Sequence, residues 1–149
     1  MRKWLSALAL ALLLLPLGCH SAPQVSFDAL VSNPATYDGK TVTVDGYYFS
    51  GFEINALAGS LVPASQPGNL KPQGTLIWVT PSVGTDVQSQ LYSQQNTPSG
   101  YTEYYGKLRL KGVFGAKGGY GQLGSYQYQL SIVSADVLSW VPTTAVATS

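Results

Sequence analysis

The clearest structural signal in this chain is the segment Asn33-Pro34-Ala35-Thr36-Tyr37-Asp38-Gly39-Lys40-Thr41-Val42-Thr43-Val44-Asp45-Gly46. Pro34 fixes its own φ and keeps the residue before it out of the helical region, and Asp38-Gly39 is typical of a tight turn. After the turn, the two valines point to one side and the polar residues between them to the other, which is the period of a half-buried strand. The segment therefore predicts a turn followed by the first strand of a small barrel, from about Thr41 to Phe49.

A short helix is predicted just before this segment. Three apolar residues recur there at helical spacing: Phe27, Leu30 and Val31. Ser26 stands at the N-cap position, and Pro34 follows the last turn as a stop. We therefore expect one short helix packed beside the barrel.

The middle of the chain predicts further strands with one inserted helix. Hydrophobic periodicity and turn residues give these elements in order: a strand from Gly51 to Gly59, a loop from Pro63 to Gly74, a buried strand from Thr75 to Val79, a helix from Asp86 to Gln94 capped by Thr85, and a polar loop from Thr97 to Gly106. The prediction of this helix depends on the apolar residues Val83, Val87 and Leu91, which are spaced four residues apart.

Two strands end the pattern, joined by a glycine-rich connection from Gly115 to Gly124. One runs from Lys107 to Phe114 with its leucines facing inward, and the other contains Tyr126, Tyr128, Leu130 and Ile132 on one face. The fold class is therefore mainly β with one or two short helices, arranged as a small OB-like β-barrel of about five strands with its helix between the third and fourth. The expected core residues are Val42, Val44, Trp78, Leu108, Leu110, Phe114, Leu130 and Ile132.

The N-terminus has the features of a secretory signal. A basic start, Met1-Arg2-Lys3, precedes an apolar run from Trp4 to Leu17, which is shorter than the roughly 20 residues of a membrane-spanning helix. The end of this run, Leu15-Pro16-Leu17-Gly18-Cys19, resembles the lipobox of bacterial lipoproteins. The resemblance implies cleavage before Cys19 and lipidation of its thiol, for example with palmitate. Cleavage after Ser21-Ala22 and a merely buried cysteine are the alternatives.

These signals divide the chain into a lipoprotein signal peptide at residues 1–18, a tether at residues 19–24, an OB-like barrel domain at residues 25–141 and a flexible tail at residues 142–149. We expect an exported protein held to the cell envelope by its lipid. His20, rather than Asp, follows the cysteine. This resembles the pattern sorted to the outer membrane in cells with two membranes.

Composition excludes several classes of function. The chain outside the signal peptide has six basic and seven acidic side chains, a formal charge of −1, which makes nucleic acid an unlikely partner because its binding usually needs a strongly basic face. Cys19 is the single cysteine, so intramolecular disulfides cannot stabilise the exported domain.

The pattern Asn33-Pro34-x-x-Tyr37-Asp38-Gly39-Lys40-x-Val42-x-Val44-x-Gly46 resembles a group of small, mostly uncharacterised bacterial exported lipoproteins. Later elements of the resemblance are Leu110-x-Gly112-x-Phe114 and Gly121-x-x-Gly124-x-Tyr126. The resemblance implies an OB-like barrel. Because its motifs are turn and corner residues, it implies no activity and no functional residue.

Catalytic and metal-binding sets are not evident in the sequence. His20 is the single histidine, so neither a histidine-containing triad nor a multi-histidine metal site is available within one chain, and no cofactor is expected. The seven carboxylates are scattered, and Glu53, between Phe52 and Ile54, is the one singled out as a functional candidate. The glycine-rich run at residues 115–124 lacks the Gly-Lys-Ser/Thr ending of a phosphate loop. We expect no enzyme activity.

The expected function is a membrane-anchored, non-catalytic interaction or accessory domain of the envelope. The alternative is a binding module for an oligosaccharide or another extended ligand through a tyrosine-rich barrel face. Tyrosines offer rigid stacking surfaces and neighbouring cations can orient the ligand, so the sequence predicts a site from Tyr101, Tyr104, Tyr105, Tyr120, Lys107, Arg109 and Lys111. Convergence of the tyrosines on one cleft favours the binding module, and dispersal favours the interaction domain.

Overall fold

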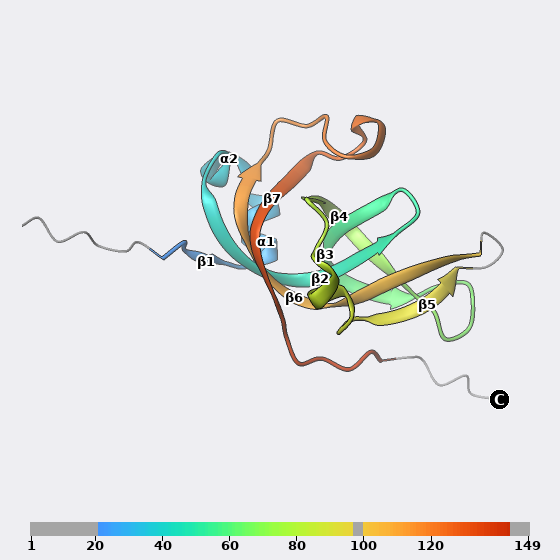
Figure 1. Ribbon diagram of the computed structural model, residues 1–149. Coiled ribbons are helices and arrows are strands. Elements are labelled where there is room, and N and C mark those ends of the chain that lie inside the picture. The colour runs from blue at the N-terminus through green and yellow to red at the C-terminus, as the bar shows by residue number, and fades with distance from the viewer. Residues whose placement is uncertain (1–20, 97–99, 144–149) are drawn as a thin grey trace, which may run out of the picture.

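The computed structural model describes residues 21–96 and 100–143. Five strands form a closed barrel (Figure 1): β2 (Thr41–Gly51), β3 (Ile54–Pro63), β4 (Leu70–Thr80), β6 (Tyr101–Gly115) and β7 (Tyr128–Val137). They pair in the order β2-β3-β4-β7-β6, and β6 pairs with β2 to close the ring. The β4–β7 pair is parallel and the others are antiparallel. The predicted small β-barrel is confirmed.

Short elements surround the barrel. They are β1 (Gln24–Val25), α1 (Phe27–Ser32), α2 (Pro34–Tyr37), α3 (Thr85–Gln88), β5 (Tyr92–Asn96) and the 3-10 turn η1 (Gln122–Gly124). β1 lies parallel to the start of β2, so Gln24, the last residue of the predicted tether, already belongs to the sheet. Three short α-helices are present in the described residues, against the one or two expected.

The turn before β2 has the predicted geometry. The Ser26 side chain caps α1 by accepting a hydrogen bond from the Ala29 backbone N–H at 3.1 Å. Gly39 has a φ of +76°, a conformation that side chains resist. Its N–H donates to the Phe114 carbonyl at 2.8 Å, which ties the turn to the end of β6. The local signal from Asp38-Gly39 therefore also sets where the barrel closes.

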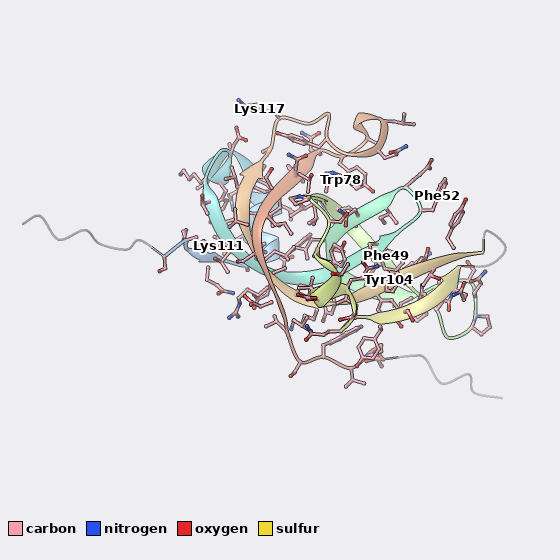
Figure 2. All side chains as sticks on the ribbon, viewed as in Figure 1. Phe49, Phe52, Trp78, Tyr104, Lys111 and Lys117 are labelled. Carbon is pink, nitrogen blue, oxygen red and sulfur yellow. The ribbon has the colours of Figure 1, made fainter. Side chains whose placement is uncertain are left out.

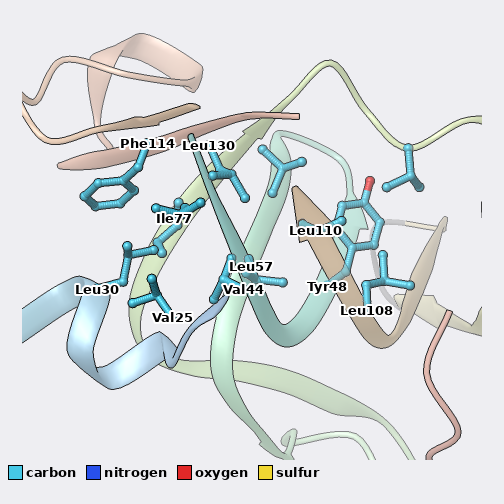
Figure 3. Close-up of a cluster of buried hydrophobic side chains, with 13 residues drawn as sticks. Val25, Leu30, Val44, Tyr48, Leu57, Ile77, Leu108, Leu110, Phe114 and Leu130 are labelled. Atoms are coloured by element: carbon cyan, nitrogen blue, oxygen red, sulfur yellow. The ribbon is translucent and has the colours of Figure 1, made fainter. Parts of the chain in front are cut away.

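The barrel interior is a single apolar core (Figure 3). Val42 and Val44 on β2, Leu108 and Leu110 on β6, and Leu130 on β7 are fully buried, together with Phe114. This confirms the predicted register of β2 and β6. Ile132 packs against the same core and is partly buried. Trp78 was expected in the core, but it lies on the opposite side of β4 from the buried Ile77 and Val79 and contacts Tyr126 instead.

The structure differs from the prediction at three elements: one helix and two loops. The helix predicted for residues 86–94 ends at Gln88, because residues 92–96 pair with β6 as β5. Leu91, read as a helical position, instead packs over Gly106 of β6. The predicted loop at residues 63–74 is half strand, since β3 ends at Pro63 and β4 begins at Leu70. The described part of the predicted loop at residues 97–106 is strand from Tyr101 on. The β3–β4 loop therefore shortens to residues 64–69.

Candidate functional site

The structure does not bring the predicted ligand-binding residues together. Tyr105 is buried and packs between Phe49 and Trp140 on the outer side of the barrel. Tyr120 lies in the β6–β7 connection, with its hydroxyl 3.4 Å from the Lys117 backbone nitrogen. Only Tyr101 and Tyr104 share a cleft.

The three cations of β6 lie away from the cleft that holds Tyr101 and Tyr104, and two of them make contacts on the outward face of β6. Lys107 lies over the ring of Tyr47, with its Nζ 5.9 Å from the centroid. Arg109 forms a two-pronged ion pair with Asp45, both N–O distances being 2.8 Å, and this pairing lowers the pKa of the Asp45 carboxyl. Figure 2 shows Lys111 on the β1 side of the molecule, away from Phe52. The predicted cationic stripe is therefore no part of the cleft.

The cleft that holds Tyr101 and Tyr104 has a volume of about 470 Å³ and lies where the β2–β3 turn meets the start of β6. This volume is in the range of small-ligand sites. Its lining residues are Tyr48, Ser50, Gly51, Phe52, Glu53, Ile54, Asn55, Trp78, Ser82, Gln88, Tyr101, Thr102 and Tyr104. We call it the aromatic cleft.

One edge of the aromatic cleft is an exposed pair of stacked rings. Phe52 and Tyr101 lie face to face, with ring centroids 4.4 Å apart and an interplanar angle of 7°. Phe52 is 59% exposed and Tyr101 is 45% exposed. Each ring shields one face of the other from water, yet large apolar surface remains open to solvent. The pair is therefore a flat, pre-formed platform rather than part of a core.

The floor of the cleft is a buried polar network. The Tyr48 hydroxyl donates to Asn55 Oδ1 in a short hydrogen bond, and Asn55 Nδ2 donates to the Val79 carbonyl at 2.7 Å and to Ser82 Oγ at 3.0 Å. Burial raises the pKa of Tyr48. Because both the oxygen and the nitrogen of its side-chain amide are bonded, Asn55 on β3 links β2 and β4 to β3 at one point. The platform therefore stands on a rigid base.

Trp78 connects the cleft to the β6–β7 connection. Its ring lies 5.0 Å from that of Tyr126, and both rings press against Gly121, where an added Cβ would come within 2.7 Å of the Trp78 ring. Next along this connection, Leu123 is 94% exposed and has a φ of +53°. Glu53, in the β2–β3 turn, has a φ of +57°. Within residues 21–96 and 100–143, these two are the non-glycine residues with positive φ.

Backbone strain of this kind clusters at functional sites. The β2–β3 and β6–β7 loops are also the first-to-second and fourth-to-fifth strand connections of the five-stranded barrel. OB-type barrels bind oligonucleotides and oligosaccharides with these two loops and the face of the second and third strands. Phe52, Glu53 and Trp78 therefore stand in the region that this architecture uses for ligands.

A second cleft of about 550 Å³ lies on the other side of β6, next to the β3–β4 loop. Its polar wall is Gln94, whose side chain accepts from the Leu70 N–H at 2.9 Å and donates to the Leu70 carbonyl at 2.7 Å. The same amide donates to Glu103 Oε2 at 2.7 Å. These bonds join β5 to the start of β4, so the polar groups here have a structural role.

Other classes of site were sought in the part of the chain that the structure describes. No group of three or more potential metal ligands occurs there. Every buried side-chain nitrogen or oxygen in that part has a hydrogen-bond partner. None of its helices has the length and apolar character needed to cross a membrane. Cys19, the proposed lipidation site, lies outside the described residues.

Comparison with known proteins gives no assignment: no family model, curated protein or solved structure matches the chain. The functional argument therefore rests on the aromatic cleft. Sequence reasoning missed Phe52 and Trp78 as site residues, because an apolar residue beside a turn and a tryptophan in an apolar strand are both typical of a core. The signal that was present is Gly51, which ends β2 and leaves Phe52 in the turn that follows.

Proposed function

We propose that this protein is a non-catalytic binding domain of the cell envelope, anchored by a lipid on Cys19, and that the aromatic cleft binds an extended ligand such as an oligosaccharide. Tyr105 and Tyr120 lie outside the cleft, and this dispersal by itself favours the interaction domain. The observation that carries the binding proposal against it is the exposed, stacked Phe52–Tyr101 pair at the edge of a cleft whose floor is rigid. A pre-formed aromatic surface binds a flat ligand face without first being ordered, which reduces the entropy lost on binding.

Trp78 supports a ligand longer than one ring. It lines the cleft and also contacts Tyr126 of the β6–β7 connection, so aromatic surface continues from the β2–β3 turn toward the second loop. The cleft opens to solvent, and its residues beside the rings carry hydroxyl and amide groups, including Ser50, Gln88 and Thr102. Alternating stacking surfaces and neutral hydrogen-bonding groups suit a chain of sugar rings.

The proposed anchor is compatible with this use. Four residues lie between Cys19 and Gln24 of β1, and the five Cα–Cα steps reach about 17 Å when fully extended. β1 pairs with Val44 near the start of β2, whereas Phe52 lies eight residues further along, at most about 26 Å away at the rise of a strand. Figure 1 shows β1 and the β2–β3 turn on opposite sides of the barrel. The anchored protein would therefore hold its cleft away from the membrane surface.

The anchor is tested by replacing Cys19 with alanine and by metabolic labelling with a fatty acid. We expect label on the wild-type protein, and none on the variant, which should also leave the membrane fraction. An unlabelled wild-type protein would contradict the anchor and would leave the cleft to be judged separately.

The cleft is tested by calorimetric titration of the detergent-solubilised protein with a tetramer of N-acetylglucosamine. Phe52→Ala and Tyr101→Ala should each weaken binding at least tenfold, because each removes half of the stacked platform. Tyr120→Ala is the matched control, since it removes a tyrosine outside the cleft, and its affinity should stay within twofold of wild type. Equal losses in all three variants, or an unaffected Phe52→Ala variant, would contradict the proposed site.

A protein partner is the second candidate function, and Leu123 is the observation that favours it. A leucine that is 94% exposed in a left-handed conformation presents its whole side chain to solvent at the tip of a loop. Covering such an apolar side chain with a partner removes its surface from water, which favours association. Co-purification of an envelope protein that is lost with Leu123→Ser but kept with Phe52→Ala would support this function over sugar binding.

A further inference from the structure

Glu53 occupies a position that its side chain disfavours. Its φ of +57° lies in the left-handed region, where glycine or asparagine is the usual residue at the second position of a tight turn. The turn is short, since Gly51 pairs with Ile54 and only Phe52 and Glu53 lie between them. A carboxylate at this point is therefore not explained by the demands of the backbone.

The charge around Glu53 is unbalanced. None of the residues that line the aromatic cleft is a lysine or an arginine, and Glu53 is its one carboxylate. Arg109 is paired with Asp45 on the outer face and does not offset the charge of Glu53. The exposed carboxylate therefore gives the mouth of the cleft a negative potential next to the Phe52–Tyr101 platform.

We propose that the ligand of the aromatic cleft is a sugar chain without negative charge, and that Glu53 is the specificity-determining residue. This inference rests on the proposed function. The carboxylate accepts hydrogen bonds from sugar hydroxyl or amino groups while the ring faces stack on Phe52 and Trp78. It repels uronic acids and phosphates. A nucleic-acid ligand does not fit, because single strands are bound by grooves that combine stacking residues with cations.

The expected selectivity follows from Coulomb's law. One carboxylate of a ligand held roughly 6 Å from Glu53 in water weakens binding by about threefold, and several such groups weaken it further. The effect should be largest at low salt and should shrink as the ionic strength rises, because both charges are exposed.

The test compares three tetrasaccharides at low salt: N-acetylglucosamine, which is neutral, glucosamine, which is cationic, and galacturonic acid, which is anionic. Wild-type protein should bind the first two, and the anionic chain at least threefold more weakly than the neutral one. Glu53→Gln should bring the neutral and anionic affinities within twofold of each other. Asp28→Asn, an equal change of charge on α1 at the opposite end of the barrel, should preserve the discrimination.

The outcomes separate this inference from the function on which it rests. Wild-type protein that binds the anionic tetramer as tightly as the neutral one overturns the role of Glu53 and leaves the cleft as a sugar site. Discrimination that persists in Glu53→Gln, or disappears in Asp28→Asn, also overturns it, because net charge or another residue would then be responsible. Failure of all three chains to bind overturns the sugar-binding function itself.

Discussion

Replacing Glu53 with glycine should stabilise the protein while it removes the charge selectivity of the cleft. An L-residue in the left-handed region destabilises the folded state by roughly 1–2 kcal/mol, and glycine removes this strain. Glycine also gives the unfolded chain more freedom, which offsets about 0.4–1 kcal/mol of the gain. The expected net gain is about 0.5–1 kcal/mol. For a chain of this size it corresponds to a rise in melting temperature of about 2–4 °C.

Glu53→Ala is the matched control. It removes the same carboxylate but keeps a Cβ in the strained conformation, so it should leave the free energy of unfolding close to that of wild type. Urea unfolding followed by circular dichroism measures both variants, and the tetrasaccharide titrations measure their selectivity. A Glu53→Gly variant less stable than wild type would refute the reasoning, as would an alanine variant that gains as much as the glycine variant.

Three further predictions concern the barrel. Leu110→Ala should lower the free energy of unfolding by about 2–5 kcal/mol in urea titrations, because it empties a fully buried site; a loss below 1 kcal/mol would contradict the packing. Asp45→Asn should cost about 0.2–1 kcal/mol at pH 7 through its exposed pair with Arg109. Because the pKa of Asp45 is lowered in the folded state, the difference in stability between wild type and Asp45→Asn should vanish as the pH falls below the ordinary value of 3.8 and the carboxyl takes up its proton. A difference in stability that persists in acid would exclude the ion pair as its source. Tyr48→Phe should cost about 1–3 kcal/mol by removing the donor to Asn55, and an unchanged midpoint of thermal unfolding would show that this bond adds nothing.

The barrel could be predicted from the sequence because its signals are local and agree with one another. Val42 and Val44 alternate with polar residues, Leu108 and Leu110 alternate with cations, and all four are fully buried. Gly39 takes the positive φ that its turn requires. Where pattern, turn chemistry and burial agree, the register follows.

The strand β5 could not be predicted because the groups that stabilise it lie outside it, on β6 and at Leu70. Residues 92–96 are polar, and they extend the sheet because β6 supplies the backbone ladder and Gln94 bonds to Leu70. Local propensity is overruled by such pairing. Trp78 shows the same limit in a different form, since its place outside the core depends on Tyr126 and Gly121 of another loop.

The structure places two of the four tyrosines named from the sequence in the aromatic cleft. Tyr101 and Tyr104 do line one cleft, but Tyr105 alternates to the outer side of β6 and Tyr120 lies in another loop. Strand alternation alone places Tyr104 and Tyr105 on opposite faces. The ring that stacks on Tyr101 is Phe52. Three strands lie between these two residues in the sequence, so the platform becomes visible only from the pairing of β2 with β6.

The most direct test of the aromatic cleft follows the indole N–H signals of Trp78 and Trp140 by NMR during titration with the neutral tetramer. Trp78 lines the cleft, whereas Trp140 packs on the outer face against Tyr47 and Tyr92, and single tryptophan-to-phenylalanine variants assign the two signals. The Trp78 signal should move progressively and saturate while that of Trp140 stays within the line width. Movement of Trp140 alone, or no saturable movement of either signal, would contradict ligand binding in the aromatic cleft.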